Sequence, residues 1–207
     1  MVQVKKIVTG MIEENCYIIY EGQDALVVDP GDETSKIKNE IEELNVRPLA
    51  VILTHAHYDH IGSLEDIRTD YSSPVYISEK EEDWLSDPHK NLSVFSTHEI
   101  TARPAEYLFK PEEKVTIGPF TFTVSSTPGH SPGGVSFLFE EDKIAIVGDA
   151  LFKGGIGRTD LPGSQPELLL PSIREKLFSL PEDTLVYPGH GHETSIGHEI
   201  NTNPYFN

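Results

Sequence analysis

The chain has 207 residues, a formal net charge of −18 and 37% hydrophobic residues. This length is enough for one domain with a substantial core, so we expect a single domain over residues 1–207. The acidic composition argues against a nucleic-acid surface, which needs clustered Lys and Arg to displace counterions from phosphates. No apolar run approaches the roughly 20 residues that span a bilayer, which argues against a membrane protein.

The amino-terminal segment and the single cysteine bear on the compartment. Residues Met1–Gly10 contain no long apolar stretch and no small-residue cleavage site, unlike a secretory signal peptide. Cys16 is the one cysteine, so it cannot form an intramolecular disulfide and no oxidising compartment is required. We therefore expect a cytoplasmic protein in which Cys16 is a small buried hydrophobe rather than a nucleophile.

Strands and helices alternate in the first part of the chain. Two apolar runs flank a turn as a strand pair, and a capped segment with apolar positions at helical spacing follows. A fully apolar run, a second helical segment and another strand come next. The expected elements are strands Tyr17–Tyr20 and Ala25–Val28, a helix from Thr34 or Ser35 to about Leu44, strand Ala50–Leu53, helix Ile61–Arg68 and strand Pro74–Ser78.

The segment Glu79–Lys110 is long, polar and irregular, with scattered aromatic residues of the buried type, Trp84 and Phe95 among them. Such a segment in a compact domain is commonly a functional loop, so we expect a lid that covers the site and selects substrate. Beyond it we expect strands Phe120–Ser125, Val135–Phe139, Lys143–Val147 and Thr184–Tyr187, with helix Pro166–Leu177 between the last two. This alternation predicts the α/β class, with two sheets sandwiched between helices.

A run of metal-competent side chains follows the buried strand that ends at Leu53. His55, His57, Asp59 and His60 all lie within six residues. In an extended backbone, side chains two residues apart point the same way, so His55 and His57 can face one ion. Imidazole nitrogens bind Zn²⁺, and a carboxylate can complete or extend the ligand set. The pattern predicts a metal site at the carboxyl end of this strand.

Three later strands also end in a potential ligand: His130, Asp149 and His190. Each follows a glycine, which lets the backbone turn tightly and come close to a site. The carboxyl edge of an open α/β sheet is where such proteins gather their ligands. Taken singly, a His in a loop or an Asp after Gly is more often a solvent-facing or turn residue. Because four segments repeat the arrangement, we expect all of them to contribute to one metal centre.

The motif His55-x-His57-x-Asp59-His60, followed by a single His, a Gly-Asp and a Gly-His, resembles the signature of the metallo-β-lactamase superfamily. The resemblance extends over essentially the whole chain and implies an αββα sandwich of two mixed sheets flanked by helices. Asp29 matches the first motif of that family, a structural acid that supports the metal loop. Residues 148–160 and 188–194 resemble the small bacterial glyoxalase II-like hydrolases, a group similar to hydroxyacylglutathione hydrolase.

The family pattern implies two divalent ions, which we expect to be zinc, with iron or manganese as alternatives. The implied ligands are His55, His57 and His130 for the first ion, Asp59, His60 and His190 for the second, and Asp149 as the bridge. Such a pair holds a bridging hydroxide at neutral pH. Asp59 is the expected catalytic residue, because it both binds metal and orients that hydroxide.

A thiolate, from a thiol of pKa about 8.5, leaves without a strong general acid, so a thioester suits this site better than an amide. We expect hydrolysis of a small-molecule 2-hydroxyacyl thioester. Glyoxalase II enzymes hold glutathione with a basic helical extension, and few residues follow His190 here, so those contacts do not carry over. Lys153 and Arg158 either bind a substrate carboxylate or are surface charges, Arg158 with Asp160 as partner.

Two rival functions stay open. A mono-iron persulfide dioxygenase uses two His and a carboxylate on one ion, which residues of this set can also supply. A non-catalytic metal-binding protein is the other, although a closed structural zinc site needs about four ligands and seven are present here. A nuclease is less favoured because the chain is acidic and has no basic arm. His89, His98, His192 and His198 lack a strand-end context, so we expect them to face solvent or to lie behind the ligands.

Overall fold

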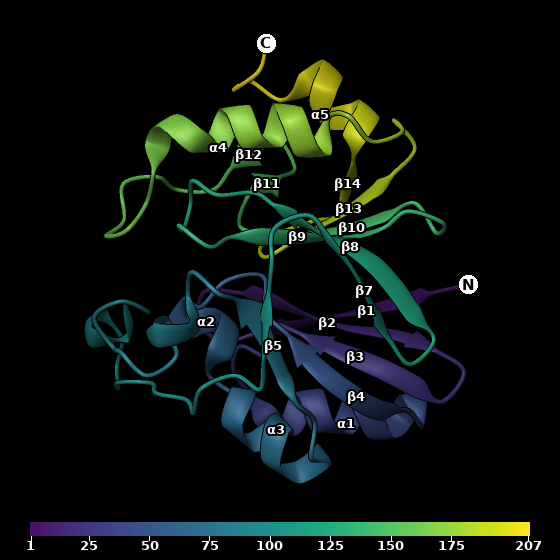
Figure 1. Cartoon of the computed structure of the whole chain (residues 1–207), viewed down its shortest axis with the longest axis vertical. Helices are drawn as coiled ribbons and strands as arrows, with labels where there is room; N and C mark the ends of the chain where they lie inside the picture. Colours follow the sequence, from purple (N-terminus) through teal and green to yellow (C-terminus); the bar gives the residue numbers. More distant parts are fainter. The chain divides into compact units, whose positions relative to one another are not determined.

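The computed structural model describes all 207 residues. The chain forms two compact units, of which the first contains Met1–Phe109 and Thr116–Phe120 and the second contains Lys110–Val115 and Thr121–Asn207. Each unit is built around a six-stranded sheet (Figure 1). The expectation of a single domain over residues 1–207 stays a prediction.

The sheet of the first unit is mixed, in the order β1-β2-β3-β4-β5-β6. Strands β1 to β3 pair antiparallel, whereas β3 to β6 run parallel to one another. The strands are β1 (Gln3–Thr9), β2 (Glu14–Glu21), β3 (Asp24–Val28), β4 (Arg47–Ile52), β5 (Val75–Ser78) and β6 (Tyr107–Phe109). Since β3 and β4 are parallel neighbours, the residues that follow them meet at one edge of the sheet.

Helices α1 (Thr34–Leu44) and α3 (Leu64–Tyr71) lie side by side on one face of this sheet (Figure 1). Ile37 and Ile41, one helical turn apart, are fully buried against the strands and place the apolar stripe of α1 in the core. A short helix, α2 (Tyr58–Ile61), carries the end of the histidine-rich motif. Ala56 and Ile61, on either side of the motif's Asp59, are buried in the core of the first unit.

The second unit also has a mixed sheet, in the order β14-β13-β10-β9-β8-β7. Strand β10 pairs parallel with β13 and antiparallel with β9. The strands are β7 (Glu113–Ile117), β8 (Phe120–Ser126), β9 (Val135–Phe139), β10 (Ile144–Gly148), β13 (Leu185–Pro188) and β14 (Thr194–Ser195). A separate hairpin of β11 (Leu151–Phe152) and β12 (Gly155–Ile156) follows β10.

Two helical segments cover the second sheet (Figure 1). Helix α4 (Pro166–Ser172) continues into a π-helical turn (Ile173–Leu177), and α5 (Ile196–Thr202) lies near the end of the chain. Leu169, Ile173 and Leu177 are fully buried and pack against the sheet residues Val147 and Val186. Burial of such side chains stabilises each by about 1.5–3 kcal/mol, so this packing fixes the strand ends that carry the later candidate ligands.

The predicted α/β class, two mixed sheets flanked by helices, is confirmed, and α1 ends at the predicted Leu44. The single helix expected over Ile61–Arg68 is wrong: α2 and α3 are separated by a turn at Gly62 and Ser63. A Cβ at Gly62 would lie 2.2 Å from the carbonyl oxygen of Gly31, so this backbone packs against another loop. The elements without a counterpart among the predicted ones are strands β1, β6, β7, β11, β12 and β14 and helix α5.

The segment Glu79–Lys110 is largely irregular, as predicted, with two short 3-10 turns (Glu82–Trp84 and Ser93–Phe95) and strand β6. Trp84 is buried, but Phe95 is 76% exposed, so the expectation that Phe95 is of the buried type is wrong. Trp84 packs into the core of the first unit. The turn around Phe95 is held instead by hydrogen bonds of Ser93 with Asn91 and Ile100, so it does not need the Phe95 ring in the core.

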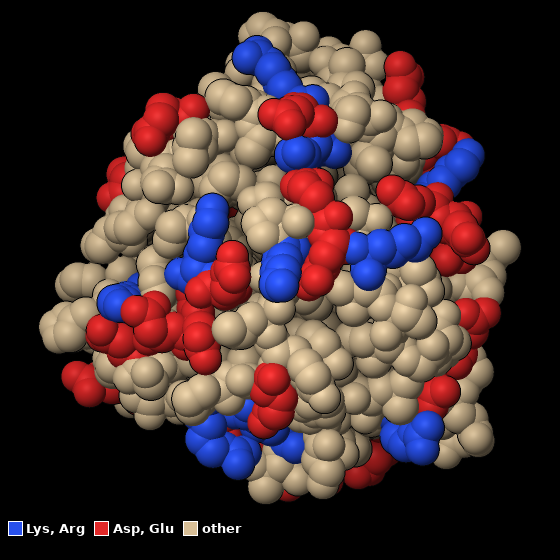
Figure 2. All heavy atoms as spheres, in the orientation of Figure 1, with Lys and Arg blue, Asp and Glu red and all other residues tan.

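The surface in view carries both signs of charge. Figure 2 shows Lys and Arg side chains next to Asp and Glu, so this face has no continuous basic area. No helix is both long and apolar enough to cross a bilayer. Cys16 is fully buried, as expected.

Candidate metal centre

Asp29 organises the metal-competent loop of the first unit. It follows β3, is buried, and is held at a positive φ of 47°. The backbone N–H of Thr54 donates to Oδ1 of Asp29 (2.7 Å), and the Thr54 hydroxyl donates to Oδ2 (2.6 Å). The start of the loop after β4 is therefore fixed to the end of β3 by one carboxylate.

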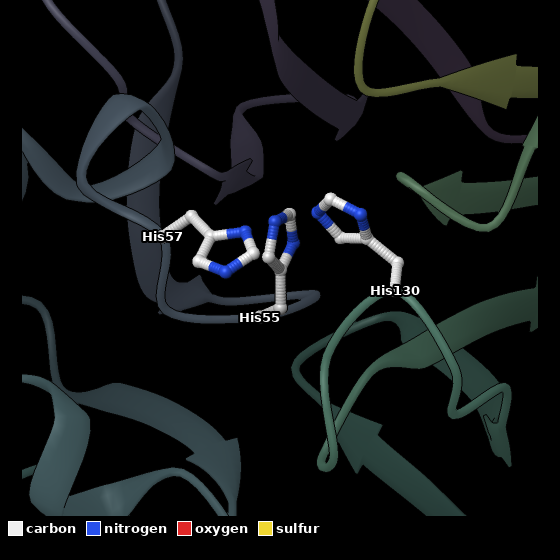
Figure 3. A group of neighbouring side chains, drawn as sticks. All are labelled: His55, His57 and His130. Carbon is white, nitrogen blue, oxygen red and sulfur yellow. The ribbon is translucent and has the colours of Figure 1, made fainter. Parts of the chain in front are cut away.

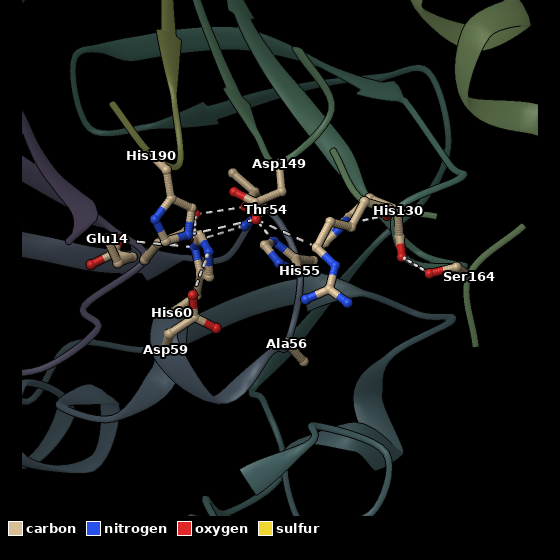
Figure 4. A network of polar contacts seen from close by, with 12 residues as sticks. Glu14, Thr54, His55, Ala56, Asp59, His60, His130, Asp149, Ser164 and His190 are labelled. Carbon is tan, nitrogen blue, oxygen red and sulfur yellow. Dashed lines mark hydrogen bonds and ion pairs between the residues drawn. The ribbon is translucent and has the colours of Figure 1, made fainter. Parts of the chain in front are cut away.

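The same carboxylate orients His60. Nδ1 of His60 lies 3.1 Å from Oδ2 of Asp29, and since a carboxylate only accepts, Nδ1 carries the proton. Nε2 is then the nitrogen that can ligate, and it lies 3.5 Å from Oδ2 of Asp59 (Figure 4). Carboxylates behind metal-binding histidines fix the tautomer in this way.

His55 and His57 leave the same loop with neighbouring rings, whose centroids are 4.8 Å apart (Figure 3). The Thr54 hydroxyl gives its proton to Asp29, so it accepts from Nδ1 of His55, 3.0 Å away. His55 therefore also presents Nε2. Between the two histidines, the backbone N–H of Ala56 donates to the buried Glu81 carboxylate (2.7 Å). Side-chain acceptors hold the motif on both sides.

The ring of His130, in the second unit, is held by a backbone carbonyl instead. This residue lies on the loop after β8 and is buried (Figure 3). Its Nδ1 donates to the carbonyl oxygen of Arg158 (2.8 Å), and its own carbonyl accepts from the Ser164 hydroxyl (2.7 Å). Nε2 is again the nitrogen that can bind a metal ion.

Asp149 lies between two histidines of the second unit (Figure 4). Its Oδ2 is 3.5 Å from Nε2 of His130 and 3.6 Å from Nε2 of His190. Asp149 follows β10 and His190 follows β13, and the N–H of Gly189 donates to the carbonyl of Gly148 (2.8 Å). The parallel pairing of these strands therefore brings the two ligand types together.

These separations fit shared metal ligands. Two atoms bound to one zinc ion at about 2.0–2.1 Å with a tetrahedral angle lie roughly 3.3–3.4 Å apart. The pair His60–Asp59 and the two pairs made by Asp149 are 3.5–3.6 Å apart, longer than a good charged hydrogen bond. Asp29, His55 and His60 also form a close group of ligand-type atoms. Imidazole and carboxylate donors are the set that divalent zinc, iron or manganese accepts.

Three supporting residues escaped the sequence analysis. Glu14 accepts from the Thr9 hydroxyl and lies 3.8 Å from Nδ1 of His60, and burial raises its pKa well above the usual range. Glu81 lies in the charged run 79–83, a pattern that is typical of an exposed segment. At Gly157 a Cβ would lie 1.8 Å from the carbonyl oxygen of Asp149. The sequence offered no signal for these residues, because the role of each depends on tertiary contacts.

The predicted substrate contacts lie on the exposed side of the second unit. Arg158 forms a surface pair with Asp160 (2.9 Å), and that hydrogen bond raises the pKa of its guanidinium. Its contribution to the centre is its backbone carbonyl, behind His130. Lys153 is exposed, and a role of either side chain in substrate binding stays a prediction. His89, His98, His192 and His198 are exposed, as expected.

Comparison with known proteins identifies the family. The model of the metallo-beta-lactamase superfamily matches residues 10–190. The chain belongs to this superfamily. The resemblance expected from the sequence is thus confirmed, and the His and Asp groups of a superfamily member indicate divalent metal ions.

Two relatives from the superfamily cover nearly the whole chain. The probable metallo-hydrolase YqgX of Bacillus subtilis is 45% identical over 98% of this chain and 97% of its own length. The hydroxyacylglutathione hydrolase GloC of Haemophilus influenzae is 35% identical over 94% and 93%, respectively. These similarities identify the chain as a metallo-hydrolase of the superfamily.

Two solved structures of superfamily members match over similar lengths. BLEG-1, described as a B3 metallo-beta-lactamase, has a TM-score of 0.96 and 44% identity, covering 99% of both chains. TTHA1623, solved in a di-iron-bound form, has a TM-score of 0.88 and 34% identity, covering 98% of this chain and 100% of its own. This chain therefore shares the metallo-β-lactamase fold with both proteins. The metals and substrates named for them describe those two proteins.

Proposed function

We propose that this protein hydrolyses a small 2-hydroxyacyl thioester with two divalent ions. The observation that supports the proposal best is the position of Asp149, whose Oδ2 is almost equally far from Nε2 of His130 and of His190. A carboxylate so placed suits a bridge between two ions. In this proposal one ion is held by His55, His57 and His130 and the other by Asp59, His60 and His190, with Asp149 shared.

The chain's own residues set the geometry of the reaction. When bound, the ions lower the pKa of a shared water and polarise the substrate carbonyl. Asp29 and the Arg158 carbonyl keep Nδ1 of His60 and of His130 protonated, so each ring presents Nε2. The Asp59 side chain, 12% exposed, can accept a hydrogen bond from the attacking water and orient it toward the carbonyl. Asp59 is therefore the proposed catalytic residue.

The choice of a thioester rests on the leaving group and on similarity. A thiolate departs near neutral pH without a proton, whereas an amide nitrogen requires one. A relative 35% identical to this chain is named as a hydroxyacylglutathione hydrolase, which also favours a 2-hydroxyacyl thioester as the small-molecule substrate. Zinc is the metal that we propose, and the di-iron form of TTHA1623 makes iron the alternative to be measured.

One experiment tests metal and reaction together. Protein purified without added metal is analysed for zinc, iron and manganese, and then assayed with S-lactoyl thioesters, a cephalosporin, and a persulfide with oxygen uptake recorded. We expect two ions per chain and thioester hydrolysis without oxygen consumption. Persulfide-dependent oxygen uptake, or turnover of the cephalosporin alone, would replace the proposed reaction.

A matched pair of histidine variants tests the ligand assignment. We expect His190→Ala to lose one of the two ions and most of the activity. His192→Ala alters an exposed histidine two residues away and should retain both ions and the wild-type rate. Equal metal content in the two variants would contradict the role proposed for His190.

A further inference from the structure

A cavity of about 400 Å³ lies beside Asp59, entirely within the first unit. This volume falls in the range of roughly 300–1,000 Å³ that is typical of small-molecule sites. The cavity is bounded mainly by two loops, one between β1 and β2 and the other over residues 95–100. Its lining consists of Thr9, Gly10, Met11, Ile12, Gly31, Asp32, Tyr58, Asp59, Gly62, Phe95, Ser96, Thr97, His98 and Ile100.

Large apolar side chains stand exposed on both loops. Met11 is 94% exposed and Ile12 is 49% exposed, on the loop between the strands. Phe95, at 76%, is on the other loop. Single exposed apolar residues are common, but three around one cavity form a patch of the kind that marks a binding site.

Buried polar contacts hold both loops in place. The Asn91 amide donates to the carbonyls of Trp84 and Ile100, and the backbone N–H of Ile100 donates to the Ser93 hydroxyl. On the other side, the Thr9 hydroxyl donates to Glu14 and accepts from the N–H of Asp32. The apolar side chains are thus presented by fixed backbones, which reduces the entropy that a ligand must overcome on binding.

The wall of the cavity has no cationic side chain, since neither Lys nor Arg lines it. Asp59 is assigned to a metal ion, so Asp32 is the carboxylate that gives the wall a negative charge. A carrier with carboxylates would meet Asp32 and no Lys or Arg partner, which disfavours it. An uncharged group with apolar surface would meet Met11, Ile12 and Phe95.

We propose that this cavity binds the thiol carrier of the substrate and selects an uncharged, apolar carrier over a dicarboxylate such as glutathione. The inference rests on the proposed thioester hydrolysis. A 2-hydroxyacyl group of a few heavy atoms fills only a small part of about 400 Å³, so the carrier is the part of the substrate that needs this space. Asp59, which lines the cavity, is also the proposed catalytic residue, so the cavity adjoins the proposed reacting carbonyl.

Two lactoyl thioesters of similar size test the selection. One has N-acetylcysteamine as the thiol, which is neutral, and the other has mercaptosuccinate, a dicarboxylate. We expect kcat/KM of the metal-loaded wild-type protein to be about tenfold higher or more for the neutral carrier. Phe95→Ala and Met11→Ala should raise KM for that ester about three- to tenfold and leave kcat unchanged, as expected for lost uniform binding.

Two further variants complete the design. Asp32→Lys should lower KM for the mercaptosuccinate ester selectively, because it adds a cation to the wall. Tyr205→Ala is the matched control, because Tyr205 is an aromatic residue of the second unit that is 54% exposed. This variant should leave kcat/KM for both esters unchanged. Equal kcat/KM for the two esters overturns the carrier assignment. So does an unchanged KM for the neutral ester in both Phe95→Ala and Met11→Ala.

A direct binding measurement separates this inference from the proposed reaction. The 2-oxopropyl thioethers of the same two thiols resemble the thioesters but cannot be hydrolysed. Calorimetry with metal-loaded protein should give a lower Kd for the neutral thioether than for the dicarboxylate one. The Kd of the neutral thioether should be higher in Phe95→Ala than in the wild type. If neither thioether binds, or both bind equally, the carrier site is wrong even where thioesters turn over. If the neutral thioether binds but no thioester is hydrolysed, the carrier site stands and the reaction is wrong.

Discussion

The two units present their candidate ligands in different ways. In the first unit, four candidate ligands lie within six residues after one strand, and acidic side chains from elsewhere hold that loop. In the second unit, three candidate ligands follow three separate strands, and backbone carbonyls and glycines hold them. A contiguous motif depends on a few supporting side chains, whereas a dispersed set depends on the whole sheet. The difference predicts which substitutions act on metal binding alone and which act on folding as well.

Replacement of Asp149 should have the largest effect, because this residue is proposed to bind both ions. We expect Asp149→Ala to lower kcat/KM by about 10³-fold or more, and to reduce the content of both ions. The measurement is metal analysis beside thioester kinetics. Asp160→Ala, at an exposed carboxylate, should leave both quantities unchanged. Loss of one ion alone would argue against a bridge.

Asp29→Asn tests the side-chain support of the first unit. An amide cannot accept from Thr54 at both atoms and from His60, so the tautomer of His60 is no longer fixed. We expect metal affinity to fall about 10–100-fold, as for other groups behind metal-binding histidines. Competition with a chelator measures this affinity. Asp70→Asn, on the exposed face of α3, is the control and should retain wild-type affinity.

Gly157→Ala tests the backbone support of the second unit. The added methyl group would overlap the Asp149 carbonyl, so the loop must shift. We expect a loss of about 1–3 kcal/mol in the free energy of unfolding together with weaker metal binding. Urea unfolding measures the first effect. At Gly155 the added Cβ meets its nearest neighbour at 3.7 Å, so Gly155→Ala should be nearly neutral. Normal stability of Gly157→Ala with weak metal binding would remove the expected link to folding.

The smallest predicted effect concerns pH and the buried Arg68 of α3, whose guanidinium donates to the Glu65 and Glu106 carboxylates. Burial raises the pKa of Glu106, but hydrogen bonds from Arg68 and the Val75 N–H outweigh it, so the net pKa is lowered. A lowered pKa stabilises the fold above the unfolded value of about 4.3 and loses that effect as the pH falls below it. Glu106→Gln should therefore destabilise the protein at pH 7 more than at pH 3.5, as measured by urea unfolding at both values. A pH-independent difference would contradict this.

Periodicity and motif spacing predicted much of the structure. Ile37 and Ile41 at helical spacing identified α1, and apolar runs identified the central strands of both sheets. Polar edge elements such as β1, with two lysines in its seven residues, carry no such pattern and were not predicted. The four strand-end segments could be recognised because ligands and glycines recur there. The supporting groups could not, because Glu14 and Glu81 acquire their role only through tertiary contacts.

Glu81 also has a consequence for loop engineering. It belongs to the same irregular segment as Phe95, yet its carboxylate holds the backbone between His55 and His57. The segment therefore has a fixed end and an exchangeable end. Sequences transplanted between residues 93 and 100 can reshape the surface around the cavity, whereas a graft that begins before residue 82 also removes an acceptor of the metal loop. A loop library for new substrates should be confined to residues 94–99, which leaves Glu81, the core residue Trp84 and the Ser93–Ile100 hydrogen bond in place.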